Sequence, residues 1–171
     1  MSGIETERKF LVRGTAYRDL AFSHSRICQG YICSGHGHTV RVRRRDDKAY
    51  LTIKGPSADG GLSRYEFEKE ITVDEAQQLM KLCQGPLIDK TRYLVRSGSH
   101  IFEVDEFRGD NAGLVIAEVE LGSADEPFVK PSFVGDEVTG DRRFYNSALR
   151  LMPYVLWRGT IATEYRHTEL E

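Results

Sequence analysis

Long apolar runs are missing from this sequence of 171 residues. A helix that crosses a membrane needs roughly 18 or more consecutive apolar residues, and no segment approaches that length. Residues 1–9 carry charges where a secretory signal peptide needs an apolar stretch. We therefore expect no membrane span and a cytoplasmic location.

Cysteine is scarce, and there is no excess of basic residues. The three cysteines lack Cys-x-x-Cys spacing, so they are interpreted as reduced structural thiols. A formal net charge of -2 and a pI of about 6.2 argue against a general nucleic-acid binder, which normally carries a clear basic excess. The length and the 40% hydrophobic content suit a single globular domain over residues 1–171.

Apolar and polar residues alternate with a period of two through most of the chain. This period is typical of β-strands, and short links such as Ser97-Gly98-Ser99 favour antiparallel neighbours. Helices are predicted at Asp74–Cys83, where Asp74 can cap the N-terminus, and more briefly at Tyr17–Phe22 and Phe144–Met152. The eight predicted strands are Ile4–Val12, Arg26–Cys33, Thr39–Arg45, Lys48–Lys54, Arg64–Thr72, Lys90–Arg96, His100–Phe107 and Leu114–Leu121.

Charged residues gather on one face of these predicted strands. In the first strand, Glu5, Glu7 and Lys9 share a face, and Arg8 lies on the other. The sign of the charge changes from strand to strand instead of mixing within each strand. The acidic positions on later strands are Glu66, Glu68, Asp105, Glu118 and Glu120, and the basic ones are Arg41, Arg43, Lys54, Lys90 and Arg92.

A polar strand face usually means only contact with water. Three observations favour an interior face here. Like charges are segregated although side-by-side like charges repel; seven of the eight strands show the pattern; and eight antiparallel strands are enough to close a barrel without free edges. We predict a mainly β fold with flanking helices (α+β), a closed eight-stranded antiparallel barrel with a charged interior and an apolar outer face covered by helices.

A charged barrel interior has chemical consequences. Unpaired buried charges cost several kcal/mol each, and clustered carboxylates raise one another's pKa unless cations lie among them. Hard oxygen ligands favour Mg²⁺ or Mn²⁺, whereas clustered Arg and Lys favour a polyanion. A metal ion beside a cationic clamp is the equipment of phosphoryl transfer.

The segment Ile4-Glu5-Thr6-Glu7-Arg8-Lys9-Phe10 contains a Glu-x-Glu-x-Lys motif. It resembles the signature of the CYTH superfamily, also called triphosphate tunnel metalloenzymes. The resemblance extends over roughly residues 3–155, is closest to the short bacterial members that resemble inorganic triphosphatases, and leaves residues 155–171 unassigned. The accompanying motifs, in the family's order, are Gln29-Gly30-Tyr31, Thr39-Val40-Arg41-Val42-Arg43, Leu51-Thr52-Ile53-Lys54, Lys90-Thr91-Arg92-Tyr93, Glu103-Val104-Asp105-Glu106-Phe107, Ala117-Glu118-Val119-Glu120-Leu121, Val138-Thr139-Gly140-Asp141 and Tyr145-Asn146.

The resemblance implies a tunnel in which carboxylates bind Mg²⁺ or Mn²⁺ and cations bind a small-molecule triphosphate. A homodimer is compatible with it, although no sequence feature shows one. Glu66, Glu68 and Asp105 match further acidic positions that either bind metal or pair with cations. The implied metal-binding residues are Glu5, Glu7, Glu118 and Glu120, which with Lys9 form the implied catalytic set, and the implied triphosphate-binding residues are Lys9, Arg41, Arg43, Lys54, Lys90 and Arg92.

The leading hypothesis is metal-dependent hydrolysis of inorganic triphosphate to pyrophosphate and phosphate. The same family includes class IV-type adenylate cyclases, which make cyclic AMP from ATP, and thiamine triphosphatases, so the substrate is a separate question. A non-catalytic polyphosphate-binding module is the alternative from another class. The carboxylates argue against that module, because they would weaken the binding of an anion without a metal.

Overall fold

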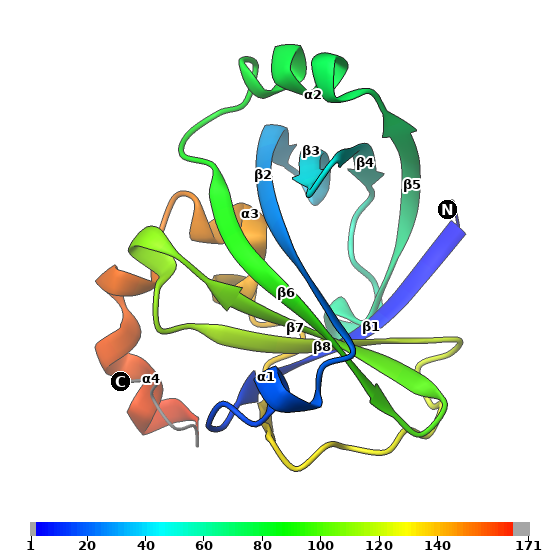
Figure 1. Ribbon diagram of the computed structural model, residues 1–171, viewed down its shortest axis with the longest axis vertical. Coiled ribbons are helices and arrows are strands. Elements are labelled where there is room, and N and C mark those ends of the chain that lie inside the picture. Colours follow the sequence, from blue (N-terminus) through cyan, green and yellow to red (C-terminus); the bar gives the residue numbers. More distant parts are fainter. Residues whose placement is uncertain (1–2, 166–171) are drawn as a thin grey trace.

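The computed structural model describes residues 3–165, and a single antiparallel sheet closed on itself dominates it (Figure 1). The sheet order is β5-β4-β3-β2-β6-β7-β8-β1-β9, and an additional pairing of β5 with β1 closes eight strands into a barrel. The eight predicted strands and the barrel are thus confirmed, and β9 is an unpredicted addition. The strands are β1 Gly3–Val12, β2 Ser23–Gly35, β3 His38–Arg45, β4 Lys48–Lys54, β5 Ser63–Ile71, β6 Ile88–Ser97, β7 His100–Phe107, β8 Val115–Leu121 and β9 Val134–Glu137.

Strand β1 is the seam of the barrel, because it pairs with three other strands. Its first part, Gly3–Thr6, pairs with β5. Residues Thr6–Leu11 pair with β8, and the end of the strand pairs with β9 across a register shift between Phe10 and Val12. The strand that carries the Glu-x-Glu-x-Lys motif therefore also joins the two edges of the sheet.

The helices are short, and none in the described part of the chain is both long and apolar enough to span a membrane. The predicted cap of α2 is wrong: Thr72, not Asp74, caps this helix. The Thr72 hydroxyl accepts from the Glu75 amide at 3.0 Å, and the Glu75 carboxylate accepts from the Thr72 amide at 3.0 Å; this reciprocal pair is a capping box. The helices are α1 Tyr17–Leu20, α2 Val73–Met80, α3 Asn146–Leu149 and α4 Arg158–Glu164, with 3₁₀ turns η1 Asp59–Gly61, η2 Gly109–Asn111, η3 Arg142–Phe144 and η4 Tyr154–Leu156.

The apolar outer face of the barrel is covered only in part. Tyr17 of α1 and Phe133 pack over β1, β6, β7 and β8, and α2 lies across β2, β3 and β4 (Figure 1). Helices were expected to cover this face, but part of it on β1, β4 and β5 has no helix over it. The side chains left exposed there, on β1, β4 and β5, are Ile4, Ile53, Tyr65 and Phe67.

The charged lining does not continue to both ends of the barrel. At one end, residues on the same strand faces are apolar and pack against the C-terminal segment, drawn orange to red in Figure 1. Phe144 and Leu149 are both fully buried in this cluster. The predicted helix Phe144–Met152 is accordingly shorter, because Tyr145 is extended and the α3 helix ends at Leu149. The barrel residues of the cluster are Leu11, Ile88, Phe107 and Ile116.

Candidate active site

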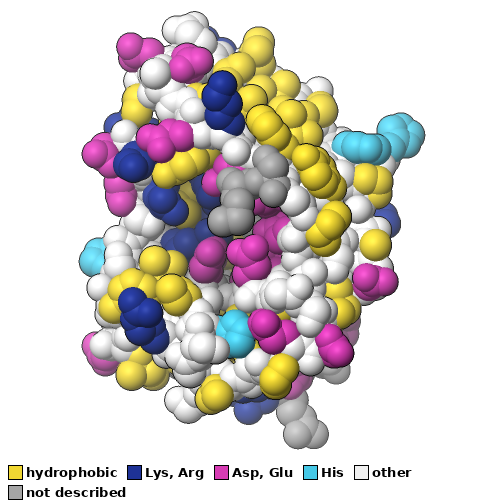
Figure 2. Space-filling view, turned by 90° about the vertical axis from the view of Figure 1, so that its right-hand side faces the viewer, with side chains coloured by type: hydrophobic (Ala, Val, Ile, Leu, Met, Phe, Trp, Pro, Cys, Tyr) yellow, Lys and Arg dark blue, Asp and Glu magenta, His cyan; other side chains and the backbone are white. Residues whose placement is uncertain are grey.

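Charged side chains of β1 and β3 to β8 converge in the barrel interior. Figure 2 shows a hollow with Lys and Arg along one wall and Asp and Glu along the other. Strand register explains the convergence, since paired positions such as Lys9 and Glu118 or Arg92 and Asp105 share a face. Only β2 contributes no charge to this face; its interior positions include Gln29 and Tyr31, both buried. The predicted residues on these strand faces are Glu5, Glu7, Lys9, Arg41, Arg43, Lys54, Glu66, Glu68, Lys90, Arg92, Asp105, Glu118 and Glu120.

Lys9 and Glu118 form an ion pair at the middle of the β1–β8 seam. The Lys9 ammonium lies 3.3 Å from the Glu118 carboxylate. Burial lowers the pKa of Lys9, but Glu118 and Glu7 outweigh it, so the pKa is raised. Burial likewise raises the pKa of Glu118, but Lys9 and the other cations outweigh it and bring the pKa to about 2. Both groups are therefore charged at neutral pH.

Glu7 and Glu120 lie directly opposite each other on the same seam. Among the described residues, no Lys or Arg lies within ion-pair distance of either carboxylate. Burial and then Glu118 raise the pKa of Glu7 to about 7. The pKa of Glu120 is also raised, by burial and by neighbouring carboxylates of which Glu5 contributes most. Lys54 and Lys9 oppose this shift at Glu7 without outweighing it.

Lys54 on β4 holds two carboxylates together. Its ammonium lies 2.7 Å from Glu5 and 3.0 Å from Glu66. Burial raises the pKa of Glu5 although Lys54 opposes it, whereas Lys54 outweighs burial at Glu66 and lowers the pKa of that group. Two carboxylates thus share one cation.

Asp105 on β7 is paired with two cations of β6. It accepts from Lys90 at 2.7 Å and from Arg92 at 2.7 and 2.8 Å, and Arg92 also contacts Glu103. Burial would raise the pKa of Asp105, but Arg92 and Lys90 hold it well below its usual range. Burial dominates at Lys90 and lowers its pKa to about 8 despite the pairing. In this structure, Asp105 neutralises cations.

Arg41 and Arg43 on β3 are only partly neutralised. Each lies 3.8 Å from the Glu68 carboxylate, which also accepts from the Thr52 hydroxyl at 3.1 Å. Burial and then Arg41 lower the pKa of Arg43 to about 9. The buried Nε–H groups of both arginines lack an acceptor among the described residues. An unsatisfied buried donor is costly, so these two guanidinium groups suit an anionic ligand.

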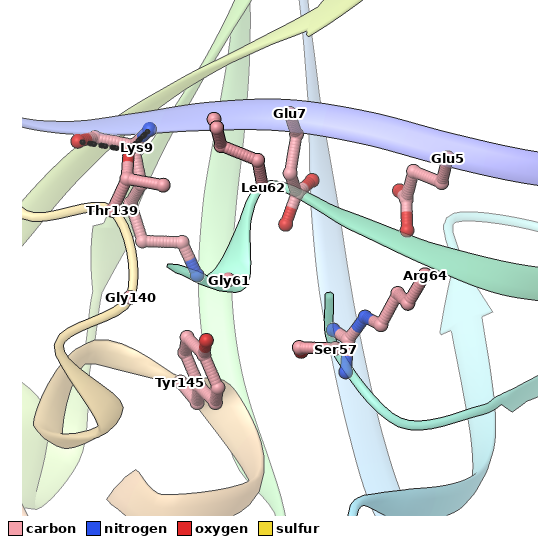
Figure 3. Close-up of a pocket in the computed structure, with 10 residues that line it drawn as sticks. All are labelled: Glu5, Glu7, Lys9, Ser57, Gly61, Leu62, Arg64, Thr139, Gly140 and Tyr145. Atoms are coloured by element: carbon pink, nitrogen blue, oxygen red, sulfur yellow. Dashed lines mark hydrogen bonds between the residues drawn. The ribbon is translucent and has the colours of Figure 1, made fainter. Parts of the chain in front are cut away.

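Three further residues of the site were not predicted as site residues, although Tyr145-Asn146 is one of the motifs on which the family resemblance rests. Arg64 on β5 lies opposite Glu5, and Tyr145 lies at the start of α3 (Figure 3). Asn146, the next residue, also lines the larger interior cavity. Asn146 accepts from Lys90 at 2.9 Å and from Gln29 at 3.4 Å. The alternation that places Glu66 in the interior also places Arg64 there, whereas no periodic pattern indicates Tyr145 or Asn146.

Two cavities meet in the interior and share Glu7, Lys9, Arg64 and Tyr145. The smaller one, shown in Figure 3, lies between β1, the loop at Ser57–Leu62 and the turn at Thr139–Gly140. The larger has a volume of about 480 Å³ including its open mouth. Its charged lining is mainly basic and consists of Lys9, Arg41, Lys54, Arg64, Lys90, Arg92, Glu7 and Glu118.

The carboxylates on the β1–β8 seam fit a divalent cation by their chemistry. Within residues 3–165, no three Asp, Glu, His or Cys side chains are gathered closely enough to hold a metal ion, because Lys54 and Lys9 hold Glu5 and Glu118. Glu7 and Glu120 nevertheless offer hard oxygen atoms that form no ion pair with a Lys or Arg of the described chain. Burial and neighbouring carboxylates raise the pKa of both groups, an effect that a divalent cation would oppose.

Comparisons with known proteins agree with this geometry. The sequence profile of the CYTH domain matches residues 3–145. The inorganic triphosphatase of Acetivibrio thermocellus is 48% identical over 153 residues, which cover 89% of this chain and 96% of that protein. The inorganic triphosphatase of Nitrosomonas europaea is 35% identical over 151 residues, covering 86% and 97%. The crystal structure of the inorganic triphosphatase NE1496 superposes with a TM-score of 0.61 at 32% identity, covering 86% of this chain and 94% of that one.

Proposed function

This chain belongs to the CYTH domain family, and we propose that it hydrolyses inorganic triphosphate to pyrophosphate and phosphate with a divalent metal ion. Two relatives that carry the name inorganic triphosphatase support the proposal, since they match the chain over nearly their full length. The observation in this chain that carries it is the larger interior cavity. Six cationic side chains and only two carboxylates line that cavity, which suits a compact polyanion.

The arginine and lysine side chains would make different contacts with the ligand. Arg41 and Arg43 present buried Nε–H groups that have no acceptor in the described chain, and phosphate oxygens would satisfy them. Lys90 already donates to Asp105 and Asn146, which leaves one of its three N–H groups for the ligand. Positioning and electrostatic stabilisation account for most of the catalysis of phosphoryl transfer. A cavity lined by cations in fixed positions can supply both.

We propose that Glu5, Glu7, Glu118 and Glu120 hold the metal, which is Mg²⁺ or Mn²⁺. A bound divalent metal would neutralise phosphate charge and lower the pKa of the attacking water. Glu7 and Glu120 have no cationic partner within the described residues, so binding costs them no ion pair. Lys54, Lys9 and the lining arginines orient the polyphosphate against these carboxylates. Glu66, Glu68 and Asp105 pair with cations and so keep those side chains in place.

A substrate panel tests the proposal. The purified protein is incubated with tripolyphosphate, ATP, thiamine triphosphate and pyrophosphate, each with Mg²⁺, with Mn²⁺ and with excess EDTA. We expect orthophosphate and pyrophosphate in equal amounts from tripolyphosphate, and no turnover in EDTA. Equal turnover in EDTA would contradict the metal requirement.

The same panel separates the alternatives. Cyclic AMP from ATP, without orthophosphate, would identify a cyclase. Faster hydrolysis of thiamine triphosphate than of tripolyphosphate would identify that ester as the substrate. Tight binding of tripolyphosphate without turnover under every metal condition would identify a binding module.

We also propose that the protein works in the reducing cytoplasm. Cys28, Cys33 and Cys83 are all free thiols, and Cys33 is exposed. An oxidising compartment favours disulfide formation between accessible cysteines. Fractionation of the source cells with an antibody against the protein tests this location.

A further inference from the structure

A wide groove lies outside the barrel at the end where α3 approaches it. Its walls are the β2–β3 turn at Ser34–His38, the loop at Pro56–Gly61 and the segment around α3. Its volume is about 1670 Å³ including open solvent, several times that of the interior cavity. The groove is thus large enough for an organic group attached to a triphosphate.

Tyr145 stands where this groove meets the barrel interior. It lines both interior cavities and also the groove. The Lys9 ammonium lies 4.9 Å from the centre of its ring, and the Arg64 guanidinium carbon lies 5.8 Å from it. Figure 3 shows the ring below the Lys9 ammonium and on the opposite side of the cavity from β1. Arg64 also lines all three spaces, so the ring and this guanidinium group lie together at the boundary between the interior cations and the groove.

Backbone lies close to the hydroxyl group of Tyr145. A Cβ atom on Gly61 would lie 2.9 Å from the Tyr145 hydroxyl oxygen and 2.7 Å from the Gly140 Cα. One on Gly140 would lie 2.2 Å from the Gly60 carbonyl oxygen. Only residues without a side chain allow this approach, so the loop, the turn and the ring form one packed wall. The next residue, Asn146, ties the wall to Lys90 at 2.9 Å.

We propose that Tyr145 is a specificity-determining residue that restricts the site to unsubstituted triphosphate by closing the passage from the cationic cavity to the groove. The proposal rests on the triphosphatase function proposed above. A free triphosphate needs no passage, because its end can lie beside Lys9 and Arg64. A nucleoside triphosphate has to place ribose and base beyond its phosphates, and the ring occupies that space.

The other end of the interior is a poorer exit for an organic group. The charged side chains that line that end are Glu103, Glu120, Asp46, Arg45 and Arg92. Phosphates drawn toward that end would leave Lys9, Lys90 and Arg64, which line the interior cavity. The cations therefore favour an orientation in which a substituent meets Tyr145.

The test compares kcat/KM for ATP with kcat/KM for tripolyphosphate in the full-length protein. Tyr145→Ala is expected to raise the ratio of ATP to tripolyphosphate at least about tenfold, within the range by which pocket shape discriminates substrates. Tyr145→Phe keeps the ring and should stay within about twofold of wild type. Tyr65→Ala is the matched control, because Tyr65 is exposed on the outer face of β5 beside Arg64.

Thermal melts show whether the variants fold, and Tyr145→Leu replaces Tyr145→Ala if the latter does not. An unchanged ratio of the two kcat/KM values would overturn the proposal. If both values fell by the same factor, Tyr145 would only support Lys9 and Arg64. If the wild-type protein did not hydrolyse tripolyphosphate, the proposed function would be refuted. If the wild type were active and the Tyr145→Ala variant had the same ratio, only the inference about Tyr145 would be refuted.

Discussion

Glu7 on β1 lies directly opposite Glu120 on β8, with both carboxylates on the interior face of the seam. Like charges at directly opposed positions destabilise a sheet. Burial, and after it the Glu118 carboxylate, raise the pKa of Glu7 to about 7. The site has a local electrostatic conflict that a divalent cation would relieve.

The metal-free protein should lose stability as the pH rises, because of Glu7. A carboxyl group with a pKa raised from 4.5 to about 7 on folding contributes stability that is complete below 4.5 and is lost as the pH rises through about 7. Glu7→Gln removes this contribution, so in EDTA its Tm relative to wild type should be higher at pH 8 than at pH 5. Each kcal/mol corresponds to about 2–4 °C for a chain of this size. A Tm difference between the two proteins that stays constant from pH 5 to pH 8 would contradict the raised pKa of Glu7.

Glu118→Ala should reduce turnover far more than Arg8→Ala. Glu118 faces the interior and pairs with Lys9, whereas Arg8 lies on the outer face and donates to Glu137 at 2.6 and 2.7 Å. We expect a loss of about 100-fold or more for Glu118→Ala, typical of removing a group that acts on the transition state, and less than about twofold for Arg8→Ala. Orthophosphate release from tripolyphosphate measures both. Comparable losses would show that the two faces are exchanged.

Asp105→Asn should destabilise the fold. The substitution leaves the buried Lys90 and Arg92 without their shared carboxylate, and breaking a buried ion pair costs about 3–5 kcal/mol. Urea unfolding measures the change. Glu103→Gln is the matched control on the same strand, because Glu103 is more exposed and contacts Arg92 alone. Equal stability of the two variants would mean that water already screens the Asp105 cluster.

Arg64→Gln should raise the KM for tripolyphosphate by about tenfold, which corresponds to one charge-assisted contact of about 1.4 kcal/mol. Arg64 lines both interior cavities. Arg44→Gln is the control, because Arg44 is exposed on the outer face of β3, where it donates to the Asp46 carbonyl. A KM that changes equally in both variants would point to overall charge instead of a local contact.

Alternation along the strands predicted much of this structure. It assigned Glu5, Glu7 and Lys9 to one face and Arg8 to the other, and the register of β1 with β8 agrees. The barrel followed from the number of strands and their short links, because an antiparallel sheet of eight strands can eliminate its edges. These features depend on the alternation of side chains along each strand, which can be read from neighbouring residues in the sequence.

Features that depend on packing between distant segments could not be predicted in this way. Strand β9 has four residues, includes Gly135 and lacks clear alternation, and it exists because β1 offers it an edge. Tyr145 is placed at the cavity by the packing of α3 against the barrel end, and no period indicates that. The cap at Thr72, in contrast, could have been predicted, since Thr72-Val73-Asp74-Glu75 has capping-box spacing.

The triple pairing of β1 links the assembly of the site to the order of synthesis. The ribosome produces β1 first, but its partners β8 and β9 emerge after all the other strands. Glu7 and Lys9 therefore face Glu120 and Glu118 only when nearly the whole barrel sequence has been made. Until then, a nascent chain carries the Glu-x-Glu-x-Lys segment without the β8 residues that face it in the folded barrel. Catalytic competence should thus arise in a single late step, when the barrel closes.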